Sequence, residues 1–230
     1  MKIRAVLFDA YGTLLDVSSI GETAERLFPG QGVTLVRLWR DKQLQYSWLR
    51  TLSRNYADFW QVTADALDYA AAALGLSPDP AEQGELMVAW ERLAPFPDAS
   101  PALATLVSRG MPLAVLSNGT PAMLAAAIGH AGLGDRFAAL LSVDAVAQYK
   151  TAPAAYQLAV EHFGAAPGEL LLVSSNGWDA AGATAFGLQT FWVNRSGAPV
   201  ERVGVTPTAS GTSLLDLPVW LEARNGAAGG

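Results

Sequence analysis

Two hydrophobic patterns alternate along most of the chain. Short apolar runs, each followed by a polar loop, predict buried strands at residues 5–8, 113–116, 140–143, 170–173 and 190–193. Helical periodicity fills the intervals between the later runs, at residues 100–108, 121–130, 152–163 and 180–186. Regular alternation of this kind predicts an α/β fold, with a parallel sheet that carries helices on both faces.

A different pattern interrupts this alternation early in the chain. It is helical throughout, without a clear strand, and predicts helices at residues 21–28, 35–54, 56–74 and 80–93. Pro95-Phe96-Pro97-Asp98 then forms a linker. We therefore expect a helical cap domain at residues 18–95, inserted into a core domain built from residues 1–17 and 96–230. The Gly-rich tail, residues 226–230, is expected to fray.

Asp9 is the first residue after the first predicted strand, and Gly12 and Thr13 follow closely. The carboxyl ends of parallel strands are where ligands bind in open α/β sheets. A carboxylate held there by the N–H groups of a turn, which Gly12 makes possible, would stay ionised and could act as a nucleophile. The alternative is that Asp9 only caps a helix.

Polar loops follow two other predicted strands. Ser117-Asn118-Gly119-Thr120 could hold an anion at a helix N-terminus, and Ser174-Ser175-Asn176-Gly177-Trp178-Asp179 places a second carboxylate at the same sheet edge. Helix capping alone would also explain either loop. Lys150 is either a solvated charge beside a helix start or a cation that faces Asp9.

Composition limits the classes of function. Hydrophobic residues make up 51% of the chain and charged residues 16%, which predicts a compact protein. The net charge of −6 argues against nucleic acid as a partner. There is no cysteine, and two histidines are too few for a histidine metal cluster. No apolar run reaches the roughly 20 residues that span a bilayer, and the N-terminus leads straight into a strand, so we expect a cytoplasmic protein without a membrane partner.

Taken together, these motifs resemble the haloacid dehalogenase superfamily and, within it, the L-2-haloacid dehalogenases. The resemblance spans Ile3 to Arg195 and depends on Phe-Asp-Ala-Tyr-Gly-Thr-Leu at 8–14, Trp-Arg-Asp-Lys-Gln-Leu at 39–44, Tyr-Ser-Trp-Leu-Arg at 46–50, Leu-Ser-Asn-Gly at 116–119, Lys-x-x-Pro-x-x-Tyr at 150–156, Val-Ser-Ser-Asn-Gly-Trp-Asp at 173–179 and Trp-Val-Asn-Arg at 192–195. It implies a Rossmann-like doubly wound core with an inserted cap.

Two departures separate this chain from the phosphatases that share the superfamily motifs. Phosphatases carry a second aspartate two residues after the nucleophile, where this chain has Tyr11. They also carry acidic Mg²⁺ ligands in the last motif, where this chain has Ser174 and Ser175. A magnesium site between Asp9 and Asp179 is the alternative, but we predict a site without a metal or other cofactor.

The resemblance implies a reaction on small 2-haloalkanoates. Asp9 attacks C2 of the L-enantiomer to form an ester, halide leaves, and water then hydrolyses the ester to a D-2-hydroxy acid. The catalytic residues that it implies are Asp9, Thr13, Arg40, Ser117, Lys150, Tyr156, Ser174, Asn176 and Asp179.

Each of these residues has an expected task. Ser117 and Lys150 hold the substrate carboxylate or the nucleophile. Asp9 is oriented by hydrogen bonds from Thr13, Ser174 and Asn176, the hydrolytic water is positioned by Asp179, and Lys150 is oriented by Tyr156.

The predicted cap supplies a cation to the same site. Arg40 and Leu44 are four residues apart and share a helix face, which places a guanidinium beside an apolar side chain. By resemblance the halide contacts Arg40, Phe59 and Asn118, and the alkyl pocket is lined by Tyr11, Leu44 and Trp178. The alternative for Arg40 is a surface ion pair.

Two rival functions stay open at this stage. A phosphonate or phosphate hydrolase of the same superfamily could use Lys42 of the cap, although Lys42 lies about 200° around the helix from Arg40 by the α-helical repeat. A binding module without catalysis is the other rival. Separately, Trp39, Leu49 and Leu52 give the cap more apolar surface than one cleft needs, which predicts a homodimer through the cap.

Overall fold

The computed structural model describes residues 2–227, and in that range its main sheet contains six strands. They are hydrogen-bonded in the order β5 (Ala139–Ser142), β4 (Leu113–Ser117), β1 (Ala5–Phe8), β6 (Leu170–Ser174), β7 (Gln189–Val193) and β8 (Ala209–Gly211). Every neighbouring pair is parallel. The predicted α/β fold with a parallel sheet is therefore confirmed.

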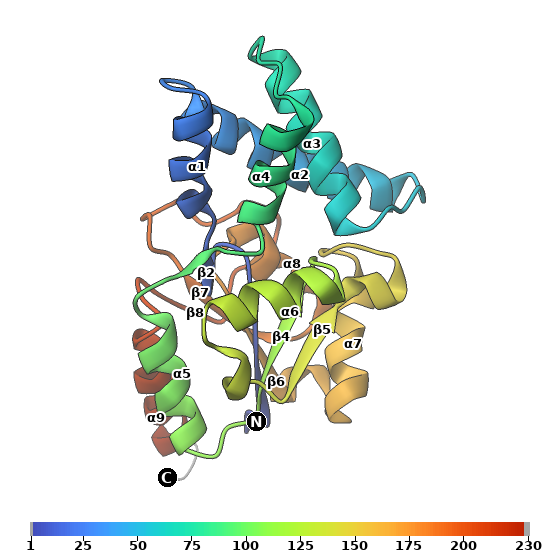
Figure 1. Ribbon diagram of the computed structural model, residues 1–230. Helices are drawn as coiled ribbons and strands as arrows, with labels where there is room; N and C mark the ends of the chain where they lie inside the picture. Colours follow the sequence, from blue (N-terminus) through green and yellow to red (C-terminus); the bar gives the residue numbers. More distant parts are fainter. Residues whose placement is uncertain (1, 228–230) are drawn as a thin grey trace.

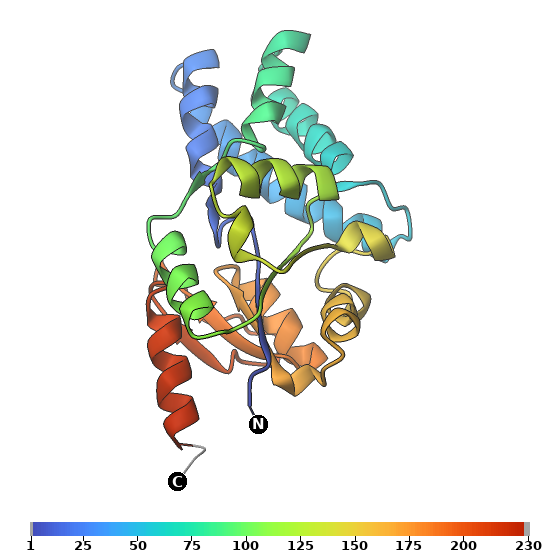
Figure 2. The ribbon, with the colours of Figure 1, turned by 60° about the horizontal axis from the view of Figure 1, so that its bottom comes forward.

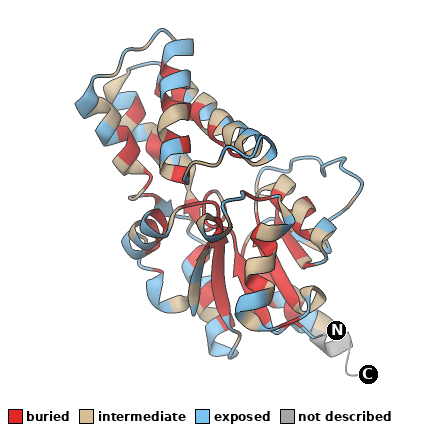
Figure 3. Cartoon of the chain, turned by 90° about the vertical axis from the view of Figure 1, so that its right-hand side faces the viewer, coloured by how far each residue is buried: buried red, intermediate tan, exposed pale blue. Residues whose placement is uncertain are grey.

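Alternate side chains of the central strand β1 enter two separate hydrophobic cores. Val6 and Phe8 share a core with helices α5 (Ala99–Ser108), α6 (Pro121–His130) and α9 (Asp216–Ala227). Ala5 and Leu7 share the other with α7 (Pro153–Phe163) and α8 (Gly177–Phe186). Figure 3 shows the strands as a buried layer between these helices, and Figure 2 shows α5 and α9 side by side. Burial on both faces explains the continuous apolar runs in the sequence.

Four further helices stand over the carboxyl ends of the strands (Figure 1). They are α1 (Ile20–Leu27), α2 (Gly32–Leu52), α3 (Phe59–Ala73) and α4 (Pro80–Ala89). They occupy the segment that the sequence pattern marked as helical. α3 begins later than expected because the Asp58 carboxylate accepts the N–H of Gln61, which fixes the start of the helix.

The chain enters and leaves this helical layer through one small ribbon. β2 (Leu15–Asp16) leads up through the 3₁₀ turn η1 (Val17–Ser19), and β3 (Ala94–Pro95) leads back and pairs with β2 in antiparallel fashion. Just past the ribbon, the N–H of Phe96 donates to the carbonyl of Leu14 at 2.9 Å. This ribbon supports the division into a core and a cap at residues 17/18 and 95/96, which we keep as a proposal.

A second contact joins the cap to the core on the side of α7. Thr51 Oγ1 accepts the N–H of Tyr149 at 3.0 Å, and the Tyr149 hydroxyl donates to the carbonyl of Ala57 at 2.6 Å. The Tyr56 hydroxyl donates to Asp144 at 2.5 Å. The cap is thus hydrogen-bonded to the loop that precedes Lys150.

Several elements were not predicted from the sequence. β8 has the sequence Ala-Ser-Gly, which favours no strand, and it pairs with β7 where Asn194 N–H donates to the carbonyl of Gly211 at 2.7 Å. Four short 3₁₀ turns were also missed, η1, η2 (Gly134–Arg136), η3 (Val143–Val146) and η4 (Pro167–Glu169). α9 reaches Ala227, inside the expected tail, and residues 228–230 lie outside the described residues. No helix among residues 2–227 is long and apolar enough to cross a membrane.

Candidate active site

Asp9 lies immediately beyond β1, where the sheet meets the cap, and only 5% of the residue is exposed. Its Oδ1 accepts a hydrogen bond from Lys150 Nζ at 3.0 Å. Its Oδ2 accepts two, from Thr13 Oγ1 at 3.1 Å and from Asn176 Nδ2 at 2.8 Å. Three predicted residues from separate parts of the chain therefore converge on this carboxylate and fix its orientation.

Glycine is required at two points around Asp9. Gly12 has a φ of +89°, a left-handed conformation that turns the chain back after Asp9. At Gly119 a Cβ atom would lie 2.9 Å from the ring and hydroxyl of Tyr11. Gly119 thus lets the loops after β1 and β4 approach each other closely.

Lys150 joins the two predicted carboxylates. The residue is 1% exposed, and its ammonium donates to Asp9 at 3.0 Å and to Asp179 at 2.8 Å. Burial alone would lower the pKa of Lys150, but the negative charges of Asp179 and Asp9 raise it above its ordinary value. The backbone N–H of Lys150 donates to Asn118 Oδ1 at 3.0 Å, so Asn118 also positions this loop.

Asp179 lies in the first turn of α8 and is fully buried. Burial raises the pKa of its carboxyl, and so does the charge of Asp9, while Lys150 lowers it. The Tyr156 hydroxyl donates to Asp179 Oδ1 at 2.9 Å. Tyr156 therefore contacts Asp179 and not Lys150, in contrast to the task expected from the sequence. Burial raises the pKa of Tyr156 well above its ordinary value, which keeps the hydroxyl protonated as a donor.

The loop after β6 differs in detail from the prediction. Ser174 Oγ accepts the N–H of Asn176 at 3.2 Å and makes no hydrogen bond to Asp9, so its expected role in orienting Asp9 is wrong. Ser175, which was not predicted as a site residue, donates its N–H to Thr13 Oγ1 at 2.9 Å. Successive residues at the end of a strand point in opposite directions, so two adjacent serines cannot both face Asp9. Ser117 is likewise buried, and its hydroxyl accepts the N–H of Gly119 at 3.2 Å.

Arg40 extends from α2 toward the core. Its Nη2 lies 3.5 Å from the carbonyl oxygen of Tyr11, which also accepts Asn176 Nδ2 at 3.2 Å, and its Nη1 donates to Gln43 at 2.5 Å. Burial lowers the pKa of Arg40, and the nearby Asp9 charge raises it. Arg40 therefore faces the Asp9 loop and makes no surface ion pair. Leu44, one helical turn further along α2, is partly buried.

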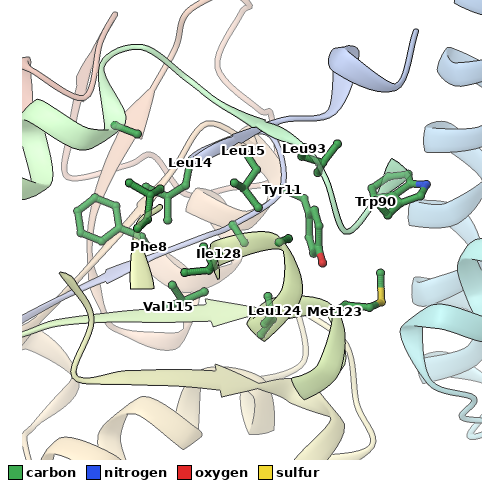
Figure 4. Close-up of a cluster of buried hydrophobic side chains, with 14 of the residues drawn as sticks. Phe8, Tyr11, Leu14, Leu15, Trp90, Leu93, Val115, Met123, Leu124 and Ile128 are labelled. Atoms are coloured by element: carbon green, nitrogen blue, oxygen red, sulfur yellow. The ribbon is translucent and has the colours of Figure 1, made fainter. Parts of the chain in front are cut away.

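Aromatic rings surround the Tyr11 side chain. Its ring centroid lies 6.0 Å from that of Phe59 and 5.6 Å from that of Trp90. Figure 4 shows Tyr11 between Trp90 and the Leu124 helix. Among residues 2–227, Tyr11 Oη and Trp90 Nε1 are the two buried side-chain polar atoms without a hydrogen-bond partner. Burial raises the pKa of Tyr11, so its hydroxyl stays protonated.

Comparisons with known proteins agree with this geometry. A family model described as haloacid dehalogenase-like hydrolase matches residues 3–187. The chain belongs to this family. It is similar to the (S)-2-haloacid dehalogenase of Pseudomonas sp. strain YL, at 44% identity over 98% of this chain and 97% of that protein.

Solved structures give the same result. The L-2-haloacid dehalogenase RSc1362 is 49% identical, with a TM-score of 0.94 over 96% of this chain and 100% of its own. The L-2-haloacid dehalogenase from Xanthobacter autotrophicus with chloropropionic acid covalently bound is 42% identical, with a TM-score of 0.90 over 96% of this chain and 98% of its own. The resemblance stated from the motifs is confirmed.

Trp178 lies apart from the aromatic rings around Tyr11. Its ring centroid is 5.5 Å from that of Trp48, and both side chains line a cavity of about 640 Å³ together with Leu52, Val203 and Val205. Tyr11 and Leu44 do not line this cavity, so the structure does not bring the three residues of the expected alkyl pocket together around it.

Metal ligands are scarce around this haloacid dehalogenase-like site. Among residues 2–227, no group of three or more His, Asp or Glu side chains could hold a metal ion. Asp9 and Asp179 could be two ligands, but the Lys150 ammonium bonds to both. The described residues therefore do not fit a magnesium centre of the phosphatase kind.

Proposed function

We propose that this protein hydrolyses L-2-haloalkanoic acids to D-2-hydroxy acids through a covalent ester on Asp9. The observation that carries the proposal is the Asp9 carboxylate, fixed by Lys150, Thr13 and Asn176 and faced by the Arg40 guanidinium. The covalently bound chloropropionic acid named in the structure of the Xanthobacter autotrophicus enzyme supports an ester at the corresponding step.

In the first step a carboxylate oxygen of Asp9 attacks C2 from the face opposite the halogen. The O–C2 bond forms, the C2–halogen bond breaks, and halide leaves with the bonding electron pair. Oδ2 already accepts two hydrogen bonds, whereas Oδ1 accepts one, from Lys150. Since a carboxylate oxygen offers two lone pairs, we infer that Oδ1 is the attacking atom.

In the second step water attacks the carbonyl carbon of the Asp9 ester. The bond between that carbon and the oxygen attached to C2 breaks, and this oxygen, which came from Asp9, leaves as the hydroxyl of the D-2-hydroxy acid with one proton of the water. The water oxygen becomes part of the regenerated carboxylate, and the second proton is released. We propose that Asp179 acts in this step by holding Lys150 beside Asp9, and not by positioning the water as expected from the sequence, because its carboxylate is fully buried against Lys150 and Tyr156. A proton taken from the water leaves through this network or through solvent.

Substrate binding is assigned to groups on both sides of Asp9. Ser117 and the N–H groups of the loop after Asp9 are proposed to hold the substrate carboxylate. Arg40, with Phe59 and Asn118, is proposed to receive the halide, since a guanidinium stabilises developing negative charge. Tyr11 and Leu44 are proposed to contact the alkyl chain, and Trp178, which lines the cavity beside Trp48, is left out of this set.

We propose that the reaction needs no metal or cofactor. The support is the Lys150 ammonium, which supplies positive charge between the two carboxylates at 3.0 and 2.8 Å. Halide also leaves without a proton, so the tyrosine at position 11, where phosphatases carry a second aspartate, does not hinder departure.

Phosphonate hydrolysis through Lys42 is disfavoured by the position of that side chain. Its ammonium bonds to Gln45 at 2.7 Å and lies 4.1 Å from the ring centroid of Tyr69. Arg40, two residues earlier, contacts Tyr11 of the core. Lys42 thus packs on the cap, while Arg40 faces the nucleophile.

The direct test measures halide released from L-2-chloropropionate and D-2-chloropropionate, beside phosphate released from a phosphomonoester with and without Mg²⁺. We expect halide from the L-enantiomer alone, no phosphate and no effect of Mg²⁺. Phosphate release that depends on Mg²⁺, without halide release, would contradict the proposal.

The Asp9→Asn variant tests the nucleophile, with Asp135→Asn on an exposed 3₁₀ turn as the matched control. Loss of a nucleophile typically lowers kcat by about 10⁴-fold or more, whereas the control should keep full activity. Mass spectrometry of quenched wild-type protein should find the ester on a peptide that contains Asp9. Unchanged halide release by Asp9→Asn would leave a binding module as the better description.

We also propose a homodimer that forms through the cap. Leu49 and Leu52 are 51% and 81% exposed on one face of α2. Trp39, which was expected to join them, is fully buried and donates to the carbonyl of Thr63 at 2.7 Å, so it is withdrawn from the interface. Light scattering should find a dimer at micromolar concentration, and Leu49→Glu with Leu52→Glu should convert it to a monomer.

The cytoplasmic location stays a prediction.

A further inference from the structure

The Trp-Val-Asn-Arg motif at residues 192–195 has no part in the chemistry above, yet its arginine reaches the loop after Asp9. Arg195 Nη2 donates to the carbonyl of Thr13 at 3.1 Å, and Nη1 to the carbonyl of Gly12 at 3.4 Å. Nη2 also donates to Asp98 Oδ1 at 2.9 Å. One guanidinium thus bonds to two peptide groups of the nucleophile loop and to one carboxylate.

Other contacts fix both members of the Arg195–Asp98 ion pair. The Arg195 guanidinium lies 4.0 Å from the ring centroid of Phe96. Asp98 Oδ2 accepts Ser213 Oγ and the N–H of Leu214, each at 2.9 Å. Burial alone would raise the pKa of Asp98, but the bonds from Arg195, Leu214 and Ser213 lower it below its ordinary value. Asp98 therefore stays ionised as a fixed anchor at neutral pH.

The contacts of Arg195 lie where the chain enters and leaves the cap. Gly12 and Thr13 immediately precede the connection that rises into the cap, while Phe96 and Asp98 immediately follow the connection that returns. Arg195 thus bridges the base of both connections. Thr13 in turn donates its hydroxyl to Asp9 Oδ2, so a single residue separates the guanidinium from the nucleophile.

We propose that Arg195 is a positioning residue that locks the Gly12–Thr13 segment to the base of the cap and thereby holds Asp9 in the orientation for attack. The proposal rests on the proposed function of Asp9. The side chains of Arg195 and Asp98 are only 22% and 15% exposed. Solvent therefore screens this ion pair less than it screens an exposed surface pair, and the pair can hold the two connections together.

Arginine is the one side chain suited to this geometry. Its planar fork offers several donors in fixed directions, so it can bond to Gly12, Thr13 and Asp98 together while its face packs on an aromatic ring. Lysine offers a single nitrogen on a flexible stem. Lysine should therefore keep the charge near Asp98 without fixing both carbonyl groups.

The test compares Arg195→Gln and Arg195→Lys with the wild type in halide release from L-2-chloropropionate. Misplacing a reacting group by about 1 Å can cost on the order of 100-fold in rate. We expect kcat to fall by about 10- to 100-fold in Arg195→Gln with KM nearly unchanged, and by less in Arg195→Lys. Quenched-flow mass spectrometry should show that formation of the Asp9 ester is the slowed step.

Arg109→Gln is the matched control. Arg109 also bonds to one carbonyl, of Pro218 at 2.8 Å, and one carboxylate, of Glu222 at 3.2 Å, but it joins α5 to α9 and touches neither connection. Arg109→Gln should show wild-type kcat and KM. If Arg195→Gln keeps wild-type kcat, or loses activity through KM alone, the proposal is wrong.

Hydrogen exchange gives a second readout that needs no turnover. In Arg195→Gln the amides of residues 14–16, Ala94 and Phe96 should exchange faster, and in Arg109→Gln they should not. If Arg195→Gln does not fold, Asp98→Asn takes its place and should change the same two readouts in the same direction. If the wild-type protein releases no halide but exchange is faster in Arg195→Gln, the proposed function is wrong and the structural part of this inference stands. If the wild-type protein releases halide but exchange in Arg195→Gln is unchanged, this inference is wrong and the proposed function stands.

Discussion

The core side and the cap side of the active site are built differently. On the core side Asp9, Lys150 and Asp179 are buried, and each charged group is bonded to at least one other. On the cap side Arg40 has a bond to Gln43 and a longer approach to the Tyr11 carbonyl at 3.5 Å. The two unpartnered buried polar atoms among the described residues, Tyr11 Oη and Trp90 Nε1, lie in the aromatic cluster beside Arg40.

This difference separates two tasks. A nucleophile must be in place before the substrate arrives, so the groups that hold it bond to one another and lose little freedom during the reaction. Groups that receive a leaving ion must keep donors uncommitted, because a donor already paired would have to break its bond first. We infer that the core side is preorganised and that the cap side is completed by substrate and halide.

Removal of the Lys150 ammonium should have the largest effect. In Lys150→Met the carboxylates of Asp9 and Asp179 would face each other in a buried site. Loss of one partner of a buried pair typically costs about 3–5 kcal/mol, so the free energy of unfolding should fall by about this much, and halide release should be lost. Urea unfolding and a halide assay measure the two effects. Lys42→Met, on the cap, should lose little of either.

The stability loss in Lys150→Met should depend on pH. Without the lysine, burial and Asp9 would both raise the pKa of Asp179 above its ordinary value of 3.8. A raised carboxyl pKa favours the folded state at low pH and destabilises it as the pH rises through that pKa. The deficit should therefore be larger at pH 7 than at pH 4. An equal deficit at both values would contradict the direct ionic contact.

Replacement of Arg40 should affect the rate and leave stability nearly unchanged. Loss of one donor to a developing anion costs about 10²- to 10³-fold in kcat, and lysine cannot reproduce the guanidinium fork. We expect Arg40→Lys to lose activity in this range while its urea midpoint stays close to that of the wild type. Arg37→Lys, exposed on the same helix, is the control. A large shift in the urea midpoint of Arg40→Lys would mean that Arg40 stabilises the fold as the core-side residues do, which would contradict the contrast between the two sides.

The sequence predicted the core side better than the cap side, for a physical reason. The carboxyl ends of parallel strands share one edge of a sheet, so the end of an apolar run marks a residue such as Asp9 at the site. Asn176 follows another such strand, and Lys150 and Asp179 complete the same edge. Side-chain direction within those loops was not predictable. Ser174 was therefore assigned a bond to Asp9 that it does not make, and the contact of Ser175 with Thr13 was missed.

The cap and the C-terminal segment depend on tertiary contacts that a single sequence does not display. Trp39 was expected at the dimer surface, yet it lies on the buried face of α2 and donates its indole N–H to the carbonyl of Thr63 in α3. Strand β8 forms through pairing with β7 despite its sequence. Arg195 belongs to a motif that the sequence marked, but its task follows only from where the chain places Thr13 and Asp98.

The pH dependence of wild-type activity gives a smaller and more specific test of the core side. Asp179 and Asp9 raise the pKa of Lys150 above its ordinary value of 10.5. A raised lysine pKa means that the stabilisation by the ammonium is fully present below pH 10.5 and is lost as the pH rises through the folded-state pKa. Halide release measured between pH 7 and pH 10 should therefore show no fall that is due to Lys150. A fall near pH 8 in kcat/KM that disappears in Lys150→Arg would contradict this assignment.

The smallest expected effects come from one chemical change made on both sides of the site. Tyr156→Phe removes a donor to the buried Asp179 carboxylate, and hydrogen bonds to charged groups contribute about 1.5–3 kcal/mol, so the free energy of unfolding should fall. Tyr11→Phe removes a buried hydroxyl that has no partner among the described residues, so the free energy of unfolding should stay equal or rise by up to about 1 kcal/mol. Urea unfolding of both variants measures the two signs. If Tyr11 Oη donates to the departing halide, Tyr11→Phe should combine this unchanged or higher stability with a lower kcat. A loss of stability in both variants would mean that the Tyr11 hydroxyl has a hydrogen-bond partner in the free protein. The polar groups of the cap side would then be hydrogen-bonded before substrate binds, as those of the core side are.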